Sequence, residues 1–228
     1  MIERIKMNNS MPKLVIITGL FCTSLAIAAD KLPETSHDGL VLQQDTELAA
    51  VYIKPGADFS GYDKLAILDC YVAFKKNWQR DQNEDHISMT QMVTKKDMEE
   101  IKTRLAAEFK KAFVEELQTK GGYEVVDHGA EDVMIIRPAI IDLDIAASDN
   151  MTPGMTTPFS ASAGQMTLYM ELFDSVTSDI IARVIDAEGG RDHGMIRNRA
   201  TNTAEADRIL RKWADMLRTH LDQVHGKK

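Results

Sequence analysis

Two long segments of this chain carry apolar residues at helical spacing, and they limit its fold more than any other feature. The first segment begins at Thr94, which with Asp97 three residues later resembles a capping box, and Lys120-Gly121-Gly122 is predicted to stop it. Its apolar residues cover about 120° of the helix circumference, the width of one buried stripe. They are Met98, Ile101, Leu105, Phe109, Ala112 and Phe113. The second segment, 203–225, has the stripe Ala206, Ile209, Leu210, Trp213, Leu217, Leu221 and Val224.

Segments with strand-like alternation supply a partner for these helices. Strands are expected near 50–53, 65–74, 123–126, 133–145, 165–174 and 180–187. In 65–74 a period of two places one set of side chains on a single apolar side: Ala66, Leu68, Cys70, Val72 and Phe74. Pro138 demands a sheet edge or a bulge, because proline cannot donate a ladder hydrogen bond. The pattern predicts an α+β fold: a mixed or antiparallel sheet of about five or six strands with two long helices packed on one face.

The N-terminal residues have the features of a cleavable signal peptide. Basic residues precede an apolar run, and the small-x-small pattern at 26–28 offers a peptidase site, so 1–28 are predicted to be removed. The apolar run is only marginally long enough for an uncleaved membrane anchor. Phe21 stands where lipidation of Cys22 needs a small residue, which argues against a lipid anchor there. We therefore expect export to the periplasm or cell envelope, with no transmembrane span after cleavage.

Removal of 1–28 takes away three basic residues and one acidic residue, leaving 24 basic against 34 acidic residues. So acidic a chain is a poor partner for nucleic acid. The remaining 200 residues suit one domain, predicted at 49–228 after a loose N-terminal tether at 29–48. Cys70 would then lack an intramolecular partner, and its strand setting predicts a buried, inert thiol.

The clearest candidate binding patch is the cluster of Lys75, Lys76, Trp78 and Arg80. An exposed tryptophan flanked by cations is a common anchor for a partner surface. The alternative is that Trp78 folds back onto the core. A second candidate contact element is the loop at 148–164, which is rich in proline, glycine and small residues.

Evidence for catalysis or metal binding is weak. Asp142 and Asp144 would project from one side of a strand about 7 Å apart, but that side is predicted to be wet. The acidic cluster around Asp81, which includes Glu84, Asp85 and His86, lacks the spacing of a calcium loop. His220 lies on the apolar stripe of the second helix, as expected of a hydrogen-bonded core histidine. No nucleophile elbow, zinc spacing or phosphate-binding glycine pattern is present. No catalytic residue, metal or cofactor is therefore predicted.

Four stretches together resemble a bacterial family catalogued as domain of unknown function 3313. They are Tyr52–Lys64, Tyr71–Phe74 with the following Trp78 and Arg80, Leu172–Asp179 and Ala206–Asp222. The similarity covers about residues 50–224. It implies an exported envelope protein, often with a lipidated cysteine near the start, and this chain departs from that pattern at Phe21. The family has no assigned activity, so no functional residues follow from the resemblance.

These observations predict a non-enzymatic cell-envelope protein that binds or helps to assemble another envelope protein. The alternative is a small-ligand carrier or hydrolase with a pocket beneath the 148–164 loop. In that alternative, His193 and Asp142 or Asp144 would converge from separate strands.

Overall fold

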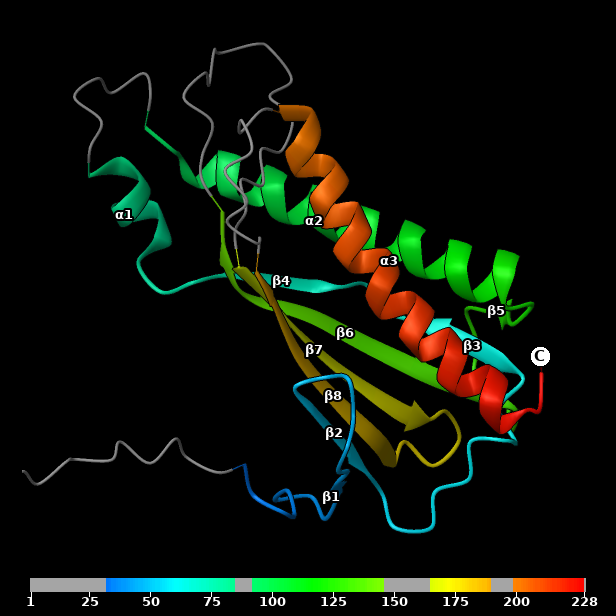
Figure 1. The fold of residues 1–228 in the computed structure, drawn as a ribbon. Coiled ribbons are helices and arrows are strands. Elements are labelled where there is room, and N and C mark those ends of the chain that lie inside the picture. The colour runs from blue at the N-terminus through cyan, green and yellow to red at the C-terminus, as the bar shows by residue number, and fades with distance from the viewer. Residues whose placement is uncertain (1–31, 85–91, 146–164, 190–198, 228) are drawn as a thin grey trace, which may run out of the picture. The chain divides into compact units, whose positions relative to one another are not determined.

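One mixed sheet organises the chain (Figure 1). The structure, a computed structural model, describes residues 32–84, 92–145, 165–189 and 199–227. Within these residues the sheet has eight strands: β1 (Val41–Leu42), β2 (Ala50–Ile53), β3 (Lys64–Ile67), β4 (Tyr71–Phe74), β5 (Glu124–Val125), β6 (Val133–Asp144), β7 (Gln165–Asp174) and β8 (Ile180–Gly189). The helices are α1 (Trp78–Asn83), α2 (Lys95–Val114) and α3 (Arg199–Val224), and a π-helical turn, Glu115–Lys120, continues α2.

The strand order is β1-β2-β8-β7-β6-β3-β5, and β4 also pairs with β6. Neighbouring strands along the path β1-β2-β8-β7-β6 pair antiparallel. In contrast, β3 and β4 run parallel to β6, and β5 runs parallel to β3. The predicted α+β class with a mixed sheet is thus confirmed. The expected number of strands was too low for two reasons: the two-residue β1 was not predicted, and the single strand expected at 65–74 is divided into β3 and β4. The strand expected at 123–126 is present as the short β5.

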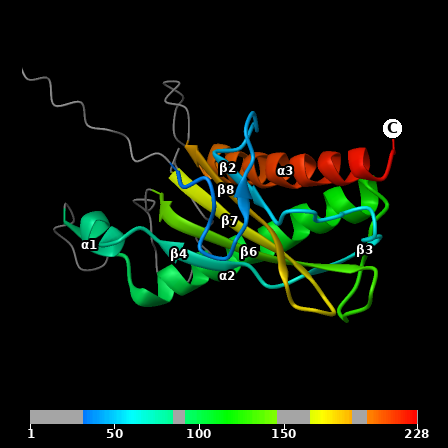
Figure 2. The ribbon, with the colours of Figure 1, turned by 90° about the horizontal axis from the view of Figure 1, so that it is seen from below.

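Both long helices lie on one face of the sheet, as Figures 1 and 2 show. The predicted capping box is present at the start of α2, where the Thr94 amide donates to Asp97 Oδ2 at 2.7 Å. The predicted stripes of both helices are largely buried, and they join the inward-facing strand residues in one apolar core. The short helix α1 was not expected from the sequence.

The segment 65–74 forms two strands rather than one, and the predicted side of alternation is wrong in its first half. Leu65 and Ile67 enter the core, whereas Leu68 is 44% exposed on the other face. The pairing of β6 explains the break. Its edge pairs with β3 as far as Ile136 and with β4 from Ala139 onwards, so Pro138 lies opposite the interruption. Leu68 N donates to Ile136 O, so the backbone groups of residue 136 point to the edge that pairs with β3. Alternate residues of a strand direct their backbone groups to the same edge, so those of residue 138 point there too, and proline has no N–H to donate to a partner strand.

The segment from Pro33 to Leu48, predicted as part of a loose tether, belongs to the same compact unit as the sheet. Leu40 is fully buried against Ala50 and Tyr52, on the face of the sheet opposite the helices. The Tyr52 hydroxyl donates to Pro33 O at 3.0 Å. We call residues 33–42 the strap. The predicted signal segment 1–28, the 148–164 loop and His193 lie outside the described residues.

Gly121 marks the tightest approach between the end of the π-helical turn and α3. A β-carbon built there would lie 2.7 Å from Leu117 O and 3.0 Å from Arg218 Cγ. We expect Gly121→Ala to lower the free energy of unfolding by about 1–3 kcal/mol, because the backbone and α3 would have to shift. The measurement is urea denaturation, in which the slope of the unfolding free energy against urea concentration should stay unchanged.

Gly61→Ala is the matched control, since a β-carbon there meets no atom within 4 Å and the backbone is not left-handed. It should be neutral or slightly stabilising, because alanine restricts the unfolded chain. Equal stability of the two variants would contradict the close packing described for Gly121.

Candidate binding groove and a buried charged row

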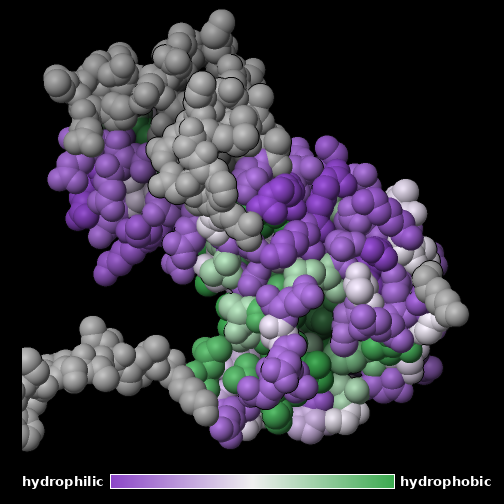
Figure 3. Space-filling model, viewed as in Figure 1, coloured by the Kyte–Doolittle hydropathy of each residue, from purple (hydrophilic) through white to green (hydrophobic). Residues whose placement is uncertain are grey.

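The helices leave part of the inner sheet face open, and a groove of about 660 Å³ lies there. Its walls are α3 on one side and the loop 43–48 on the other, and its floor is formed by β2, β7 and β8. Figure 3 shows green, apolar side chains gathered where the molecule is hollowed beside α3. The volume falls within the range of about 300–1,000 Å³ that is typical of small-molecule sites.

The floor of the groove is apolar because strand alternation sends these side chains to the helix-covered face. Val51 and Ile53 come from β2, and Leu168, Met170 and Leu172 come from β7. The three β7 side chains are 1–3% exposed. The floor is therefore an extension of the core that an apolar ligand could reach only through the groove.

Asp186 ties the two walls of the groove together. Its carboxylate is 6% exposed. Oδ1 accepts a hydrogen bond from Ala49 N at 3.0 Å, and Oδ2 accepts one from the Trp213 indole nitrogen at 2.8 Å. One buried carboxylate thus fixes α3 relative to the base of the loop 43–48.

The mouth of the groove is polar. Side chains of the loop 43–47 face the exposed side of α3, which contributes Asp215, Thr219, His220 and Gln223. His220 was predicted to be a hydrogen-bonded core histidine, and this is wrong: the residue is exposed at the mouth, with its ring edge-on to Phe59 at 5.7 Å between centroids. Partial desolvation lowers the pKa of its imidazole, so His220 is neutral at pH 7.

The predicted binding residues are split between surface and core. Lys75, Trp78 and Arg80 line one open depression of about 450 Å³, but Lys76 does not line it. Trp78 is 2% exposed and stacks on Phe74 at 4.1 Å, and its indole N–H donates to Ile145 O at 2.7 Å. An exposed tryptophan anchor is therefore wrong, and the fold-back alternative is right.

Local backbone geometry explains the position of Trp78. Asn77, immediately before α1, has a left-handed backbone (φ 65°), which asparagine tolerates. This reversal turns Trp78 back over β4. Lys75 and Arg80 remain on the surface, where Lys75 pairs with Asp144 and Arg80 pairs with Asp81.

The other candidates for chemistry do not converge among the described residues. A bulge between Ile141 and Asp144 ends the alternation that was expected to align Asp142 with Asp144. Cys70 is buried, as predicted, and burial raises the pKa of its thiol to about 12, so the thiolate is scarce at neutral pH. In the part of the chain that the structure describes, no cluster of histidine, cysteine and acidic residues could hold a metal ion.

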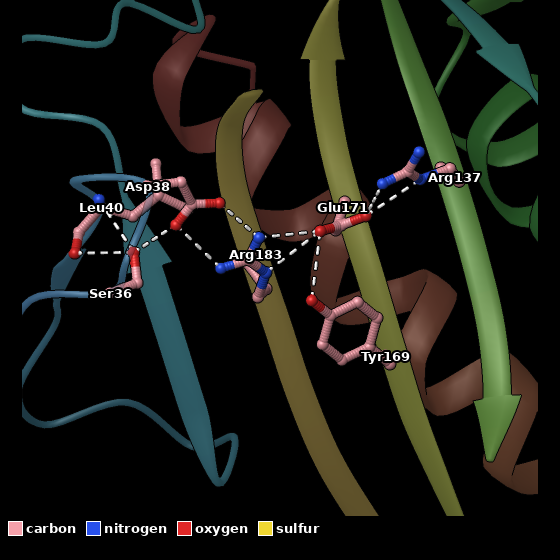
Figure 4. Close-up of polar contacts among 7 residues, drawn as sticks. All are labelled: Ser36, Asp38, Leu40, Arg137, Tyr169, Glu171 and Arg183. Atoms are coloured by element: carbon pink, nitrogen blue, oxygen red, sulfur yellow. Dashed lines mark hydrogen bonds and ion pairs between the residues drawn. The ribbon is translucent and has the colours of Figure 1, made fainter. Parts of the chain in front are cut away.

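A row of charged side chains crosses the other face of the sheet (Figure 4). Arg137 of β6, Glu171 of β7 and Arg183 of β8 lie directly opposite one another in the strand register. Glu171 accepts hydrogen bonds from Arg137 Nε at 2.9 Å and from Arg183 Nη2 at 2.9 Å. The Tyr169 hydroxyl also donates to Glu171, at 3.1 Å.

Asp38 of the strap completes this row. Both terminal nitrogens of Arg183 donate to the Asp38 carboxylate, with Nη1 at 3.0 Å from Oδ1. Hydrogen bonds from Arg183 and Ser36 hold the pKa of Asp38 well below its usual range. Burial alone would raise the pKa of Glu171, but the hydrogen bonds from Arg137 and Arg183 outweigh it and lower that pKa. The row alternates in sign and neutralises itself.

Sequence reasoning missed both the groove and the charged row. Glu171 and Arg183 are charged residues at outward positions in the middle of β7 and β8, which is a detectable signal. Their pairing, however, depends on the register between β7 and β8, and the sequence does not specify that register.

The fold is of the α+β class, with two long helices on one face of a mixed sheet. The chain belongs to the family described as "Protein of unknown function (DUF3313)", whose model matches residues 35–217. No curated protein matches the sequence.

Two crystal structures of the PelC dodecamer from Paraburkholderia phytofirmans, the one in space group C2 being of a single-substitution variant, are among the similar solved structures. The form in space group C2 has 10% identity and a TM-score of 0.36, and the match covers 74% of this chain and 95% of that chain. For the form in space group P6 the identity is 9%, the TM-score 0.31 and the coverage 72% and 94%. Because both TM-scores lie below 0.5, this likeness carries no conclusion about the chain.

Asp38→Asn tests whether the charged row holds the strap. At pH 7 we expect the free energy of unfolding to fall by about 1–3 kcal/mol, because Arg183 loses one of its two charged partners and keeps only Glu171. The pKa of Asp38 is lower in the folded protein than in the unfolded chain. Its contribution is therefore complete above the ordinary aspartate pKa of about 4 and is lost as the pH falls through the folded value. Urea denaturation at pH 7, 5 and 3 should show a smaller difference from the parent protein only at pH 3.

Asp179→Asn is the control, because it removes an exposed ion pair with Lys54 and should cost little at any of these pH values. A difference for Asp38→Asn that persists undiminished at pH 3 would show that the carboxylate charge is not what stabilises the strap.

Proposed function

We propose that this chain is a non-enzymatic protein of the bacterial cell envelope that works by binding, and that its binding site is the groove beside α3. The observation that carries the proposal is a groove of typical ligand-site volume, with an apolar floor beneath a polar mouth. The ligand would be an apolar molecule, or the apolar part of an envelope component. Each methylene group that it buries would contribute about 0.8 kcal/mol.

The chemistry of the described residues supports binding rather than catalysis. His220 reaches the mouth of the groove without a hydrogen-bonded carboxylate or hydroxyl partner among these residues. The buried carboxylate of Asp186 already accepts two hydrogen bonds, from Ala49 N and from the Trp213 indole. A general base with its orienting partner is therefore missing from the described part of the groove.

The envelope location rests on the signal-like residues 1–28 and on the acidic composition of the rest of the chain. No helix in the described part of the chain has the length and hydropathy needed to cross a bilayer. The proposed site is the groove between α3, β2 and the loop 43–48. The 148–164 loop, beneath which a pocket was expected, lies outside the described residues.

An uncharged, environment-sensitive dye such as N-phenyl-1-naphthylamine tests the groove directly. The dye should bind the unsubstituted protein with a rise in fluorescence. Val51→Phe should weaken this binding by about tenfold, because the larger ring extends from β2 into the space that the ligand needs.

Val176→Phe is the matched control, since Val176 is 61% exposed in the turn between β7 and β8. It should bind the dye as the unsubstituted protein does. Failure of the unsubstituted protein to bind the dye, or equal binding by both variants, would count against the groove as the binding site.

A further inference from the structure

The mouth of the groove carries an unbalanced negative charge, and this charge can select the head of the ligand. Asp45 and Glu47 both line the mouth and are exposed. Neither side chain forms an ion pair or a hydrogen bond with any residue that the structure describes. Asp215, on the opposite wall, is already paired with Arg218. Two carboxylates are therefore left for a ligand.

No positively charged side chain that the structure describes near the groove is left to balance these carboxylates. Among the described residues, no lysine or arginine lines the groove. Lys212, on α3 close to the groove, pairs with Glu188 instead. His220 is the remaining basic group at the mouth, and it is neutral at pH 7 because its pKa is lowered. Nothing described at the mouth could neutralise an anionic head.

We propose that the groove takes a single-chain amphiphile with a cationic head, whose aliphatic tail lies on the floor between α3 and β7. This inference rests on the proposed function and names its ligand class. The apolar floor favours the tail whatever its head, whereas Asp45 and Glu47 favour a positive head over a neutral one and disfavour a negative one. An anionic lipid or a fatty-acid carboxylate would enter the groove against this field.

Three ligands with the same tail separate these effects: dodecyltrimethylammonium, dodecyl maltoside and dodecanoate. Each displaces the bound dye from the full chain at low salt and pH 7, below its micellisation concentration. We expect the cation to bind about tenfold more tightly than the carboxylate, with the neutral maltoside between them. Added salt should narrow this range, because the mouth is exposed to solvent.

The double variant Asp45→Asn/Glu47→Gln should bring the affinities of the cation and the carboxylate to within about threefold, with the affinity of the maltoside unchanged. The matched control is Asp127→Asn/Glu131→Gln, which makes the same change of charge in an exposed turn outside the groove. It should keep the full preference for the cation.

The outcomes separate the two proposals. Dodecanoate binding as tightly as the cation, or a preference that survives in the groove variant, would overturn the cationic ligand class and leave the groove as a binding site. Absence of displacement by all three ligands, together with dye binding that Val51→Phe does not change, would overturn the proposed function itself.

Discussion

The width of the sheet relative to the two helices determines the rest of this structure. Adjacent strands lie about 4.8 Å apart and a helix with its side chains is about 10 Å wide, so each helix covers about two strands. The inner face is five strands wide from β3 and β4 to β2, before the short β1 is added. Two helices therefore leave about one strand uncovered, and the groove lies at this end, over β2, β8 and β7.

On the opposite face of the sheet, the strap rather than a helix covers the strands at this end. The strap covers β2 and β8 with Leu40, and its Asp38 supplies the partner that the buried Arg183 requires. Beyond Leu42 the chain continues into the loop 43–48, which is one wall of the groove. The same segment thus seals one face of the sheet edge and shapes the binding site on the other. An ion pair on the outer face thereby contributes to the geometry of the inner groove.

Local features of the sequence predicted most of the helices and long strands, because capping and periodicity act within one segment. The capping box at Thr94 and the buried face of α2 are examples. Pro138 indicated an interruption, but only the structure shows that the interruption is in the neighbouring edge strand rather than in β6. The position of Trp78 depended on a left-handed Asn77, and the Glu171–Arg183 pair depended on strand register. The outward-facing charges of the row are visible in the sequence, but their pairing is not. The groove has no local signal, because it joins the loop 43–48 and β2 to α3, more than a hundred residues away.

The distribution of charge distinguishes the groove from the rest of the fold. The chain has a formal net charge of −8. Many of its described carboxylates form ion pairs or hydrogen bonds that stabilise the fold. Asp38 and Glu171 hold arginines, Asp186 holds two N–H groups, and Glu115 joins the end of α2 to Arg211 of α3. Asp45 and Glu47 have no such partner among the described residues, although each lies next to an apolar floor that folding leaves open. Asp45 also occupies a left-handed backbone position (φ 58°), which aspartate tolerates, but neither its carboxylate nor that of Glu47 bonds to a described residue. The position of both carboxylates at the edge of an apolar groove therefore supports the proposed role in ligand recognition.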